Sequence, residues 1–374
     1  MIEEKKLYPM HICRLEDNWS WGTETYGLAD LGYRDSLVRD GWLAANTISE
    51  VMDTYLDRVV GDNVYEYYGR QFPLQLKTIT CKGKMPLRVH PDDRLAADRY
   101  DSLGKEKFWY VLSAGADAAI WLGFAHDVDA ARLFEGCADG SVETDLNAIK
   151  PKAGDCFRIM PGTVHGAKGD VTIIEVSESS ALDFCLTAWG QSLGEDEFDP
   201  DQNLIEALDF IDMKAYTAPE SHSHKEDMVR HLCESDLFTV NKIALSDPLH
   251  IYMEQFGCFL LYHCLYGEAS FQVQIEGIAD VPYRLKAGET LLIPAELPDF
   301  IITPFQQNTA VLEISVPRLE EKDEYINPDA DACLPEDEEE DDCCCDGEDE
   351  ECHCHHHHDG DHECHCHHHT NEDE

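Results

Sequence analysis

The chain has 374 residues, enough for two modest domains with substantial cores, and its formal net charge is −48 at pH 7. This charge argues against nucleic acid and anionic membrane surfaces as partners, because no basic stripe offsets the negative field. It suits divalent metal ions, a cationic partner or simple solubility. The longest apolar run, 256–266, is too short to span a bilayer, and the first residues carry no secretory signal, so we expect a cytoplasmic protein.

Apolar runs with the period of β-strands dominate the chain. They predict strands at 72–79, 108–112, 119–124 and 171–176. A Gly-Ala-Asp turn at 115–117 joins the second and third of these runs, as in a hairpin. Helical patterns interrupt the strands over 128–134, leading into 142–149, and over 200–216, where Asp199 is the predicted N-cap and Pro200 the first helical residue.

An internal repeat indicates two related halves. The sequence KAGDCFRIMP at 152–161 recurs as KAGETLLIP at 286–294, and each copy predicts a Gly-acid turn, a strand and a proline at a barrel rim. We therefore expect an all-β fold of two cupin or jelly-roll barrels, joined by the helix at 200–216. The second copy has Pro298-Asp299 where the first has His165, so the second barrel is expected to bind no metal.

These patterns divide the chain into three expected parts. An N-terminal barrel domain with helical insertions covers 1–216, a second barrel covers 217–318, and an acidic tail covers 319–374. The tail is predicted to be disordered, because its apolar content is too low to bury a core. Eight of the 16 cysteines lie in this tail, and the other eight are scattered among apolar residues, as core thiols rather than disulfides are.

Two histidines mark the candidate site. His90 follows an alternating apolar run in LRVHPDD, and His165 ends PGTVH after a Gly-Asp turn and a short strand. Two such positions on a β-barrel aim their imidazoles at a common interior point. The ordered motifs around them resemble those of the class I phosphomannose isomerases of the short bacterial type, over roughly 15–318. The matching motifs, in chain order, are Trp21-Gly22, FPLQLK at 72–77, VHPDD at 89–93, Gly104-Lys105, WYVL at 109–112 and PGTVH at 161–165.

The resemblance implies an enzyme that interconverts mannose 6-phosphate and fructose 6-phosphate. It also implies a bound zinc, held by a Gln and a His in a Q-V-H-P-D-D pattern, a Glu in G-K-T-E-x-W-Y and a His in G-T-V-H, with a downstream Arg assisting. A divalent cation would stabilise the negative charge that develops as the sugar forms an enediol, while a base moves the proton. His90 and His165 stand at two of these ligand positions.

Three of the implied residues are replaced. Arg88 stands at the Gln position, Lys107 at the Glu position and Cys185 at the Arg position. Two imidazoles alone make a poor zinc site, which wants at least three protein ligands. Two like unit charges about 4 Å apart repel each other by about 4 kcal/mol at an effective dielectric near 20, and the repulsion doubles when one of them is a divalent ion. Arg88 and Lys107 would therefore repel a zinc ion bound at this position. Glu106, one residue early, would point to the opposite face of a strand unless a bulge brings it in as a substitute ligand.

Several fates are open for the two introduced cations. They could pair with Asp92, Asp93 or Glu106 as an ion-pair cluster that fills a catalytically inactive site. They could instead bind an anion such as a sugar phosphate, together with Lys77 and Lys105, which match family positions. Cys185 is most simply a core thiol. Two classes of function follow: an active isomerase, or a catalytically degenerate cupin that binds a sugar phosphate or metal ions without turnover.

The tail carries a second candidate metal site. ECHCHHH at 351–357 recurs at 363–369, with two histidines between the copies and three cysteines before them. Thiolate and imidazole at this density predict labile binding of zinc, nickel or copper, and the acidic run before them would concentrate cations. The candidate ligands are Cys343, Cys344, Cys345, Cys352, His353, Cys354, His355, His356, His357, His358, His362, Cys364, His365, Cys366, His367, His368 and His369.

Overall fold

The computed structural model describes residues 5–192, 200–218, 228–278 and 281–319. The disorder and the metal ligands predicted for the tail lie outside these residues, as does Asp199. The described chain is mostly antiparallel sheet, which confirms the predicted all-β fold of two cupin-type barrels. None of the described helices is both long and apolar enough to cross a membrane.

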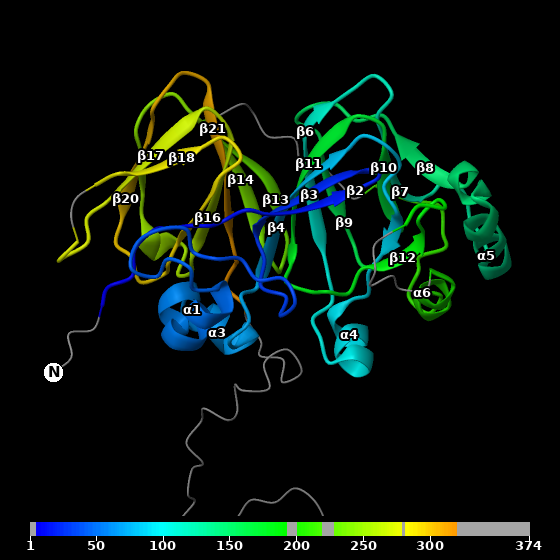
Figure 1. The fold of residues 1–374 in the computed structure, drawn as a ribbon, viewed down its shortest axis with the longest axis horizontal. Coiled ribbons are helices and arrows are strands. Elements are labelled where there is room, and N and C mark those ends of the chain that lie inside the picture. The colour runs from blue at the N-terminus through cyan, green and yellow to red at the C-terminus, as the bar shows by residue number, and fades with distance from the viewer. Residues whose placement is uncertain (1–4, 193–199, 219–227, 279–280, 320–374) are drawn as a thin grey trace, which may run out of the picture. The chain divides into compact units, whose positions relative to one another are not determined.

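Two sheets that pack face to face form the first barrel, on the right of Figure 1. One has six strands in the order β2 (Leu15–Trp19), β3 (Gly22–Leu28), β4 (Leu74–Cys81), β11 (Val171–Glu178), β6 (Lys107–Ala114) and β9 (Cys156–Ile159). The other has five, in the order β12 (Phe184–Thr187), β5 (Leu87–Val89), β10 (His165–Lys168), β7 (Ala119–Phe124) and β8 (Leu146–Ile149). The four strands predicted from the apolar runs are β4, β6, β7 and β11, and all four are confirmed.

The second barrel has the same two-sheet construction. Its six-stranded sheet runs β1 (Met10–His11), β19 (Thr290–Ile293), β16 (Leu260–Tyr266), β21 (Thr309–Ser315), β14 (Thr239–Leu245) and β13 (Val229–Glu234). Its four-stranded sheet runs β15 (Leu249–Ile251), β20 (Phe300–Pro304), β17 (Glu268–Val273) and β18 (Tyr283–Lys286). One apolar core contains residues of both barrels, and β1 adds an N-terminal strand to the second, so the barrels lie side by side.

The repeat gives equivalent turns in the two barrels. Gly154 and Gly288 have φ of 91° and 78°, in the left-handed region that glycine adopts without strain. The acid after each glycine accepts a hydrogen bond from the backbone N–H three residues earlier, at 2.8 Å for Asp155 and 2.9 Å for Glu289. The strands that follow, β9 and β19, begin next to these turns, as the repeat predicts.

Short helices cover the ends of the barrels. They are α1 (Ile48–Tyr55), α2 (Asp57–Val60), α3 (Asp62–Tyr68), α4 (Asp93–Tyr100), α5 (Ala130–Asp139) and α6 (Pro200–Ala207). The predicted helix at 142–149 is wrong, because Gly140, with φ of 80°, ends α5 and 146–149 pair with β7 as β8. The helix predicted at 200–216 ends at Ala207, and the following backbone hydrogen-bonds to the barrel instead, through Asp212 to Gly162 and Tyr216 to Phe124.

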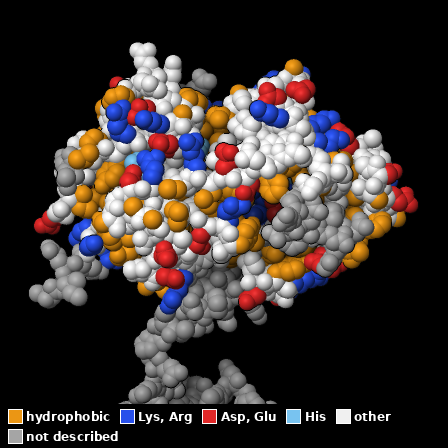
Figure 2. Space-filling model, in the orientation of Figure 1, with side chains coloured by type: hydrophobic (Ala, Val, Ile, Leu, Met, Phe, Trp, Pro, Cys, Tyr) orange, Lys and Arg blue, Asp and Glu red, His pale blue; other side chains and the backbone are white. Residues whose placement is uncertain are grey.

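The surface carries mixed charge. Figure 2 shows Lys and Arg side chains interspersed with Asp and Glu on the visible face, with no continuous basic area there.

Candidate active site: a buried ring of ion pairs

The two histidines meet inside the first barrel. His165 begins β10 and pairs in register with Arg88 of β5, and His90 follows β5 directly. Their ring centroids are 5.1 Å apart and both residues are 0% exposed. The sequence-based expectation that the two imidazoles converge on one interior point is therefore confirmed.

Lys107 of β6 projects into the same point. Its Nζ lies 3.0 Å from His165 Nε2 and 2.8 Å from Asp183 Oδ2, and it is fully buried. His165 Nδ1 lies 2.9 Å from the carbonyl of Thr163, so Nδ1 carries the hydrogen and donates to that carbonyl. The Nε2 lone pair is then left to accept a hydrogen bond from Lys107.

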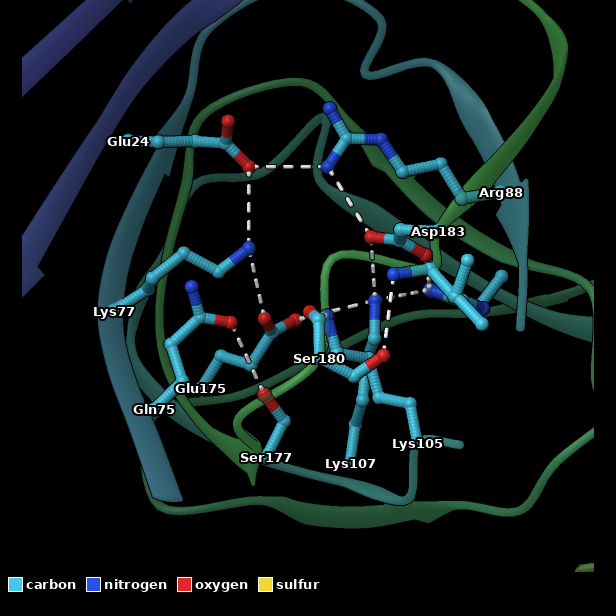
Figure 3. Close-up of polar contacts among 12 residues, drawn as sticks. Glu24, Gln75, Lys77, Arg88, Lys105, Lys107, Glu175, Ser177, Ser180 and Asp183 are labelled. Atoms are coloured by element: carbon cyan, nitrogen blue, oxygen red, sulfur yellow. Dashed lines mark hydrogen bonds and ion pairs between the residues drawn. The ribbon is translucent and has the colours of Figure 1, made fainter. Parts of the chain in front are cut away.

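Six charged side chains form a closed ring in which cations and anions alternate, as Figure 3 shows. Glu24 Oε1 contacts Arg88 at 3.1 Å and Lys77 at 3.5 Å. Glu175 contacts Lys77 at 2.9 Å and Lys107 at 3.8 Å. Asp183 closes the ring, at 2.8 Å from Lys107 and 3.5 Å from Arg88. The three cations and three anions balance, which is how a protein keeps buried charges tolerable.

Strand register places the ring. Glu175 in β11 is the direct cross-strand neighbour of Lys77 in β4 and of Trp109 in β6. The Trp109 indole N–H donates to Glu175 Oε2 at 2.7 Å, which fixes the carboxylate between the two lysines. Gln75 and Ser177 face each other two residues along the same strands and hydrogen-bond at 3.4 Å. Five of the six ring residues thus lie on strands, and Asp183 directly precedes β12.

The ring shifts the titration of its carboxylates and of the adjacent histidines. Burial alone would raise the pKa of Asp183, but Lys107 and Arg88 hold it well below its usual range. Burial likewise opposes ionisation of Glu24, and Arg88 and Lys77 lower its pKa overall. Burial, with Lys107 as the second cause, lowers the pKa of His165 to about 3. The site therefore holds ionised carboxylates and a neutral imidazole at pH 7.

Lys105 lies beside the ring as an additional buried amine. Its Nζ donates to the carbonyl of Ser180 at 2.6 Å, and the residue is 3% exposed. Burial lowers the pKa of Lys105 to about 7, against the attraction of Asp183 and with the repulsion of Lys107 and Lys77. Lys105 can therefore give or take a proton near neutral pH.

The predicted partners of the introduced cations are wrong. Asp92 Oδ1 accepts from the N–H of Leu95 as the N-cap of α4, and Asp93 Oδ1 accepts from the N–H of Gly104. Glu106 forms a two-point contact with Arg158, at 2.7 and 2.8 Å, so no bulge turns its carboxylate toward the histidines. The partners are instead Glu24, Glu175 and Asp183, which the sequence analysis missed.

Cys185 lies in β12 opposite Arg88 and is buried. Burial raises the pKa of its thiol to about 11, so the thiol stays protonated at neutral pH. The cysteines of the described residues are free thiols, in agreement with their scattered distribution in the sequence.

The fit of a metal ion can be tested on these atoms. His90, His165 and Asp183 each offer a ligand atom, and the three atoms lie within 4.8 Å of one another. Neither ring nitrogen of His90 has a hydrogen-bond partner among the described residues. However, the Lys107 ammonium already contacts two of the three donor residues. The donor spacing could hold a metal ion, but the site with Lys107 in this position does not fit a divalent cation.

The sequence of the chain was compared with those of known proteins. No family model matches the chain. The mannose-6-phosphate isomerase of Streptococcus mutans is 28% identical over 266 residues, which cover 67% of this chain and 79% of that protein. The mannose-6-phosphate isomerase ManA of Bacillus subtilis is 26% identical over 271 residues, covering 71% and 81%.

Solved structures agree on the fold. The mannose 6-phosphate isomerase of Bacillus subtilis superposes with a TM-score of 0.69 at 20% identity, over 83% of this chain and all of that one. A putative mannosephosphate isomerase from Archaeoglobus fulgidus gives 0.66 at 17% identity, over 82% and 98%. Fold and site define a two-barrel cupin protein with a polar centre in its first barrel. The chain therefore shares the fold of solved mannose 6-phosphate isomerases and resembles curated mannose-6-phosphate isomerases in sequence, at 28% identity or below.

Proposed function

We propose that the chain is an aldose–ketose isomerase that interconverts mannose 6-phosphate and fructose 6-phosphate. The observation that carries this proposal is the cluster of Lys105, Lys107 and His165 at the buried centre of the first barrel. The names of the relatives supply the substrate, because the relatives of this chain are called mannose-6-phosphate isomerases.

The reaction makes two demands on the protein. A proton must leave carbon 2 of the sugar and return to carbon 1, and negative charge must be stabilised on the oxygens of the enediol between those steps. Lys105, with a pKa of about 7, supplies an amine that is partly neutral at pH 7 and can take the proton. The buried cations of the ring supply the opposite charge in a medium that screens poorly.

The substrate would enter from the side of Arg88 and Asp183. Their side chains are 15% and 12% exposed, whereas those of Glu24, Lys77, Glu175 and Lys107 are at most 5% exposed. A guanidinium at an entrance suits a phosphate group, because it can donate two parallel hydrogen bonds. Arg88 would then exchange part of its contact with Glu24 and Asp183 for the phosphate.

We expect the purified full chain to convert mannose 6-phosphate to fructose 6-phosphate in a coupled assay. His165→Ala removes the acceptor that holds Lys107 in place, and we expect it to lower kcat by about 100-fold or more. His263→Gln is the matched control, since His263 is a buried histidine of the second barrel that contacts Thr290 at 3.1 Å. Its activity should equal that of the unmodified chain. Equal loss in both variants, or no turnover by the full chain, would contradict the proposal.

We also propose that the tail binds zinc, nickel or copper through its Cys and His side chains. The support is the sequence repeat at 351–357 and 363–369. Changing the seven tail cysteines of the candidate ligand set to Ser should remove most of the zinc that the full chain takes from a chromogenic chelator. Unchanged uptake would rule out these seven thiolates as ligands. The residues to change are Cys343, Cys344, Cys345, Cys352, Cys354, Cys364 and Cys366.

A further inference from the structure

Lys107 occupies the position on which the donor atoms of the site converge. Its Nζ is 3.0 Å from His165 Nε2 and 2.8 Å from Asp183 Oδ2, two of the three residues that are spaced to hold a metal. It comes from β6, which lies between β11 and the edge strand β9, and is fully buried. We propose that the Lys107 ammonium replaces the divalent cation of the family in this chain, so that the first barrel works without a bound metal. This inference rests on the proposed isomerase function.

The hydrogen bonds of His165 support this replacement. Its Nδ1 donates to the carbonyl of Thr163, so its single lone pair lies on Nε2, where the Lys107 contact already uses it. A metal ion at this nitrogen would have to displace the lysine. The Lys107 side chain is fully buried in this position, between His165 and Asp183.

The charge balance of the ring supports it as well. Lys77, Arg88 and Lys107 are matched by Glu24, Glu175 and Asp183. A divalent ion added beside Lys107 would leave two uncompensated charges in a buried environment, next to a cation at hydrogen-bond distance from the same donors. Replacing the ion by a single ammonium keeps the ring neutral.

The ammonium also retains a donor for the substrate. An ammonium has three N–H groups, and the contacts within hydrogen-bond distance use two of them, toward His165 and Asp183. Glu175 Oε2 at 3.8 Å is beyond hydrogen-bond range. The third N–H can donate to a sugar oxygen that becomes negative as the proton leaves carbon 2. His90, whose ring nitrogens have no hydrogen-bond partner among the described residues, lies in the same cluster and could contact a neighbouring hydroxyl.

The test compares the full chain with Lys107→Glu, which introduces a carboxylate at the family's ligand position. Both proteins are stripped with a chelator, and thermal unfolding and turnover are measured with and without zinc. For the unmodified chain we expect the same turnover with chelator as with zinc, and no zinc-dependent rise in the melting temperature of the barrels. For Lys107→Glu we expect zinc to raise the melting temperature by several degrees, because a ligand that binds only the folded state stabilises it. The tail is identical in both proteins, so zinc bound there cancels in the comparison.

Lys107→Met is the second variant, for the case in which the glutamate does not fold. It removes the charge and keeps much of the volume, and we expect turnover to fall by about 100-fold or more in a folded protein. Retained turnover would overturn the inference. So would an unmodified chain that loses its activity in chelator, regains it with zinc and melts at a higher temperature with zinc. Zinc-dependent activity would contradict the metal-free site but support the isomerase function. Absence of turnover under all conditions would contradict the isomerase function, and the melting temperatures would then show whether the first barrel binds zinc.

Discussion

Glu175→Gln is expected to lower the free energy of unfolding by about 3–5 kcal/mol, because it leaves three buried cations with only two anions in the ring. Glu175 contacts Lys77 at 2.9 Å and Lys107 at 3.8 Å, and all three side chains are at most 5% exposed. The glutamine keeps the shape, so packing changes little and the loss reports the charge. The change in the free energy of unfolding is measured by urea denaturation at pH 7, followed by circular dichroism.

A double-mutant cycle isolates the ion pair. Lys77→Met should also be destabilising, but the combination with Glu175→Gln should cost less than the sum of the two, since together they remove one cation and one anion. Asp127→Asn is the control for an exposed pair, because the contact of Asp127 with Lys214 at 2.8 Å lies in solvent, and it should leave the unfolding free energy unchanged within error. Strictly additive effects in the cycle would show that the ring is not a coupled network.

The sequence predicts the strands and histidines of this site better than the acidic side chains that pair with its cations. Strand periods, the Gly-acid repeat and the two histidine motifs are local signals, and the structure confirms the strands, the two barrels and the meeting of His90 with His165. The anions are not local: Glu24 and Asp183 reach the ring from β3 and from just before β12, far from Arg88 in the chain. Only the arrangement of five strands and the residue before β12 brings them together.

One of the three unpredicted acidic residues, Glu175, could have been recognised from the sequence. Glu175 interrupts the apolar run at 171–176, and an unpaired charge in a buried strand is costly enough to require a partner. The same strand pairing would have pointed to Lys77, its cross-strand neighbour. Asp92, Asp93 and Glu106 are near Arg88 and Lys107 in the sequence, which made them the predicted partners. Glu106 directly precedes β6, and its carboxylate contacts Arg158 instead.

Lys105→Met is expected to lower kcat for mannose 6-phosphate by about 10²–10⁴-fold, the range for loss of a general acid–base group. Burial lowers the pKa of Lys105 to about 7, so the amine is neutral in a large fraction of molecules at pH 7. In the unmodified chain, kcat should fall as the pH drops below about 7 and the amine becomes protonated. The residual activity of Lys105→Met should lack this limb of the pH profile. Lys242→Met is the matched lysine control, on a partly buried side chain that donates to Tyr110 at 3.1 Å.

The lowered pKa of Lys105 also makes the free energy of unfolding depend on pH. The sign is opposite to that of a lysine whose pKa is raised by an ion pair. The unfolded chain binds a proton at Lys105 up to a pH of about 10.4, whereas the folded chain releases it near 7. The unfolded state therefore holds more protons between these values, and the stability of the unmodified chain relative to Lys105→Met must rise with pH across that window. A relative stability that falls over the same range would mean that Lys105 stays charged in the folded protein, and the amine could then not serve as the base.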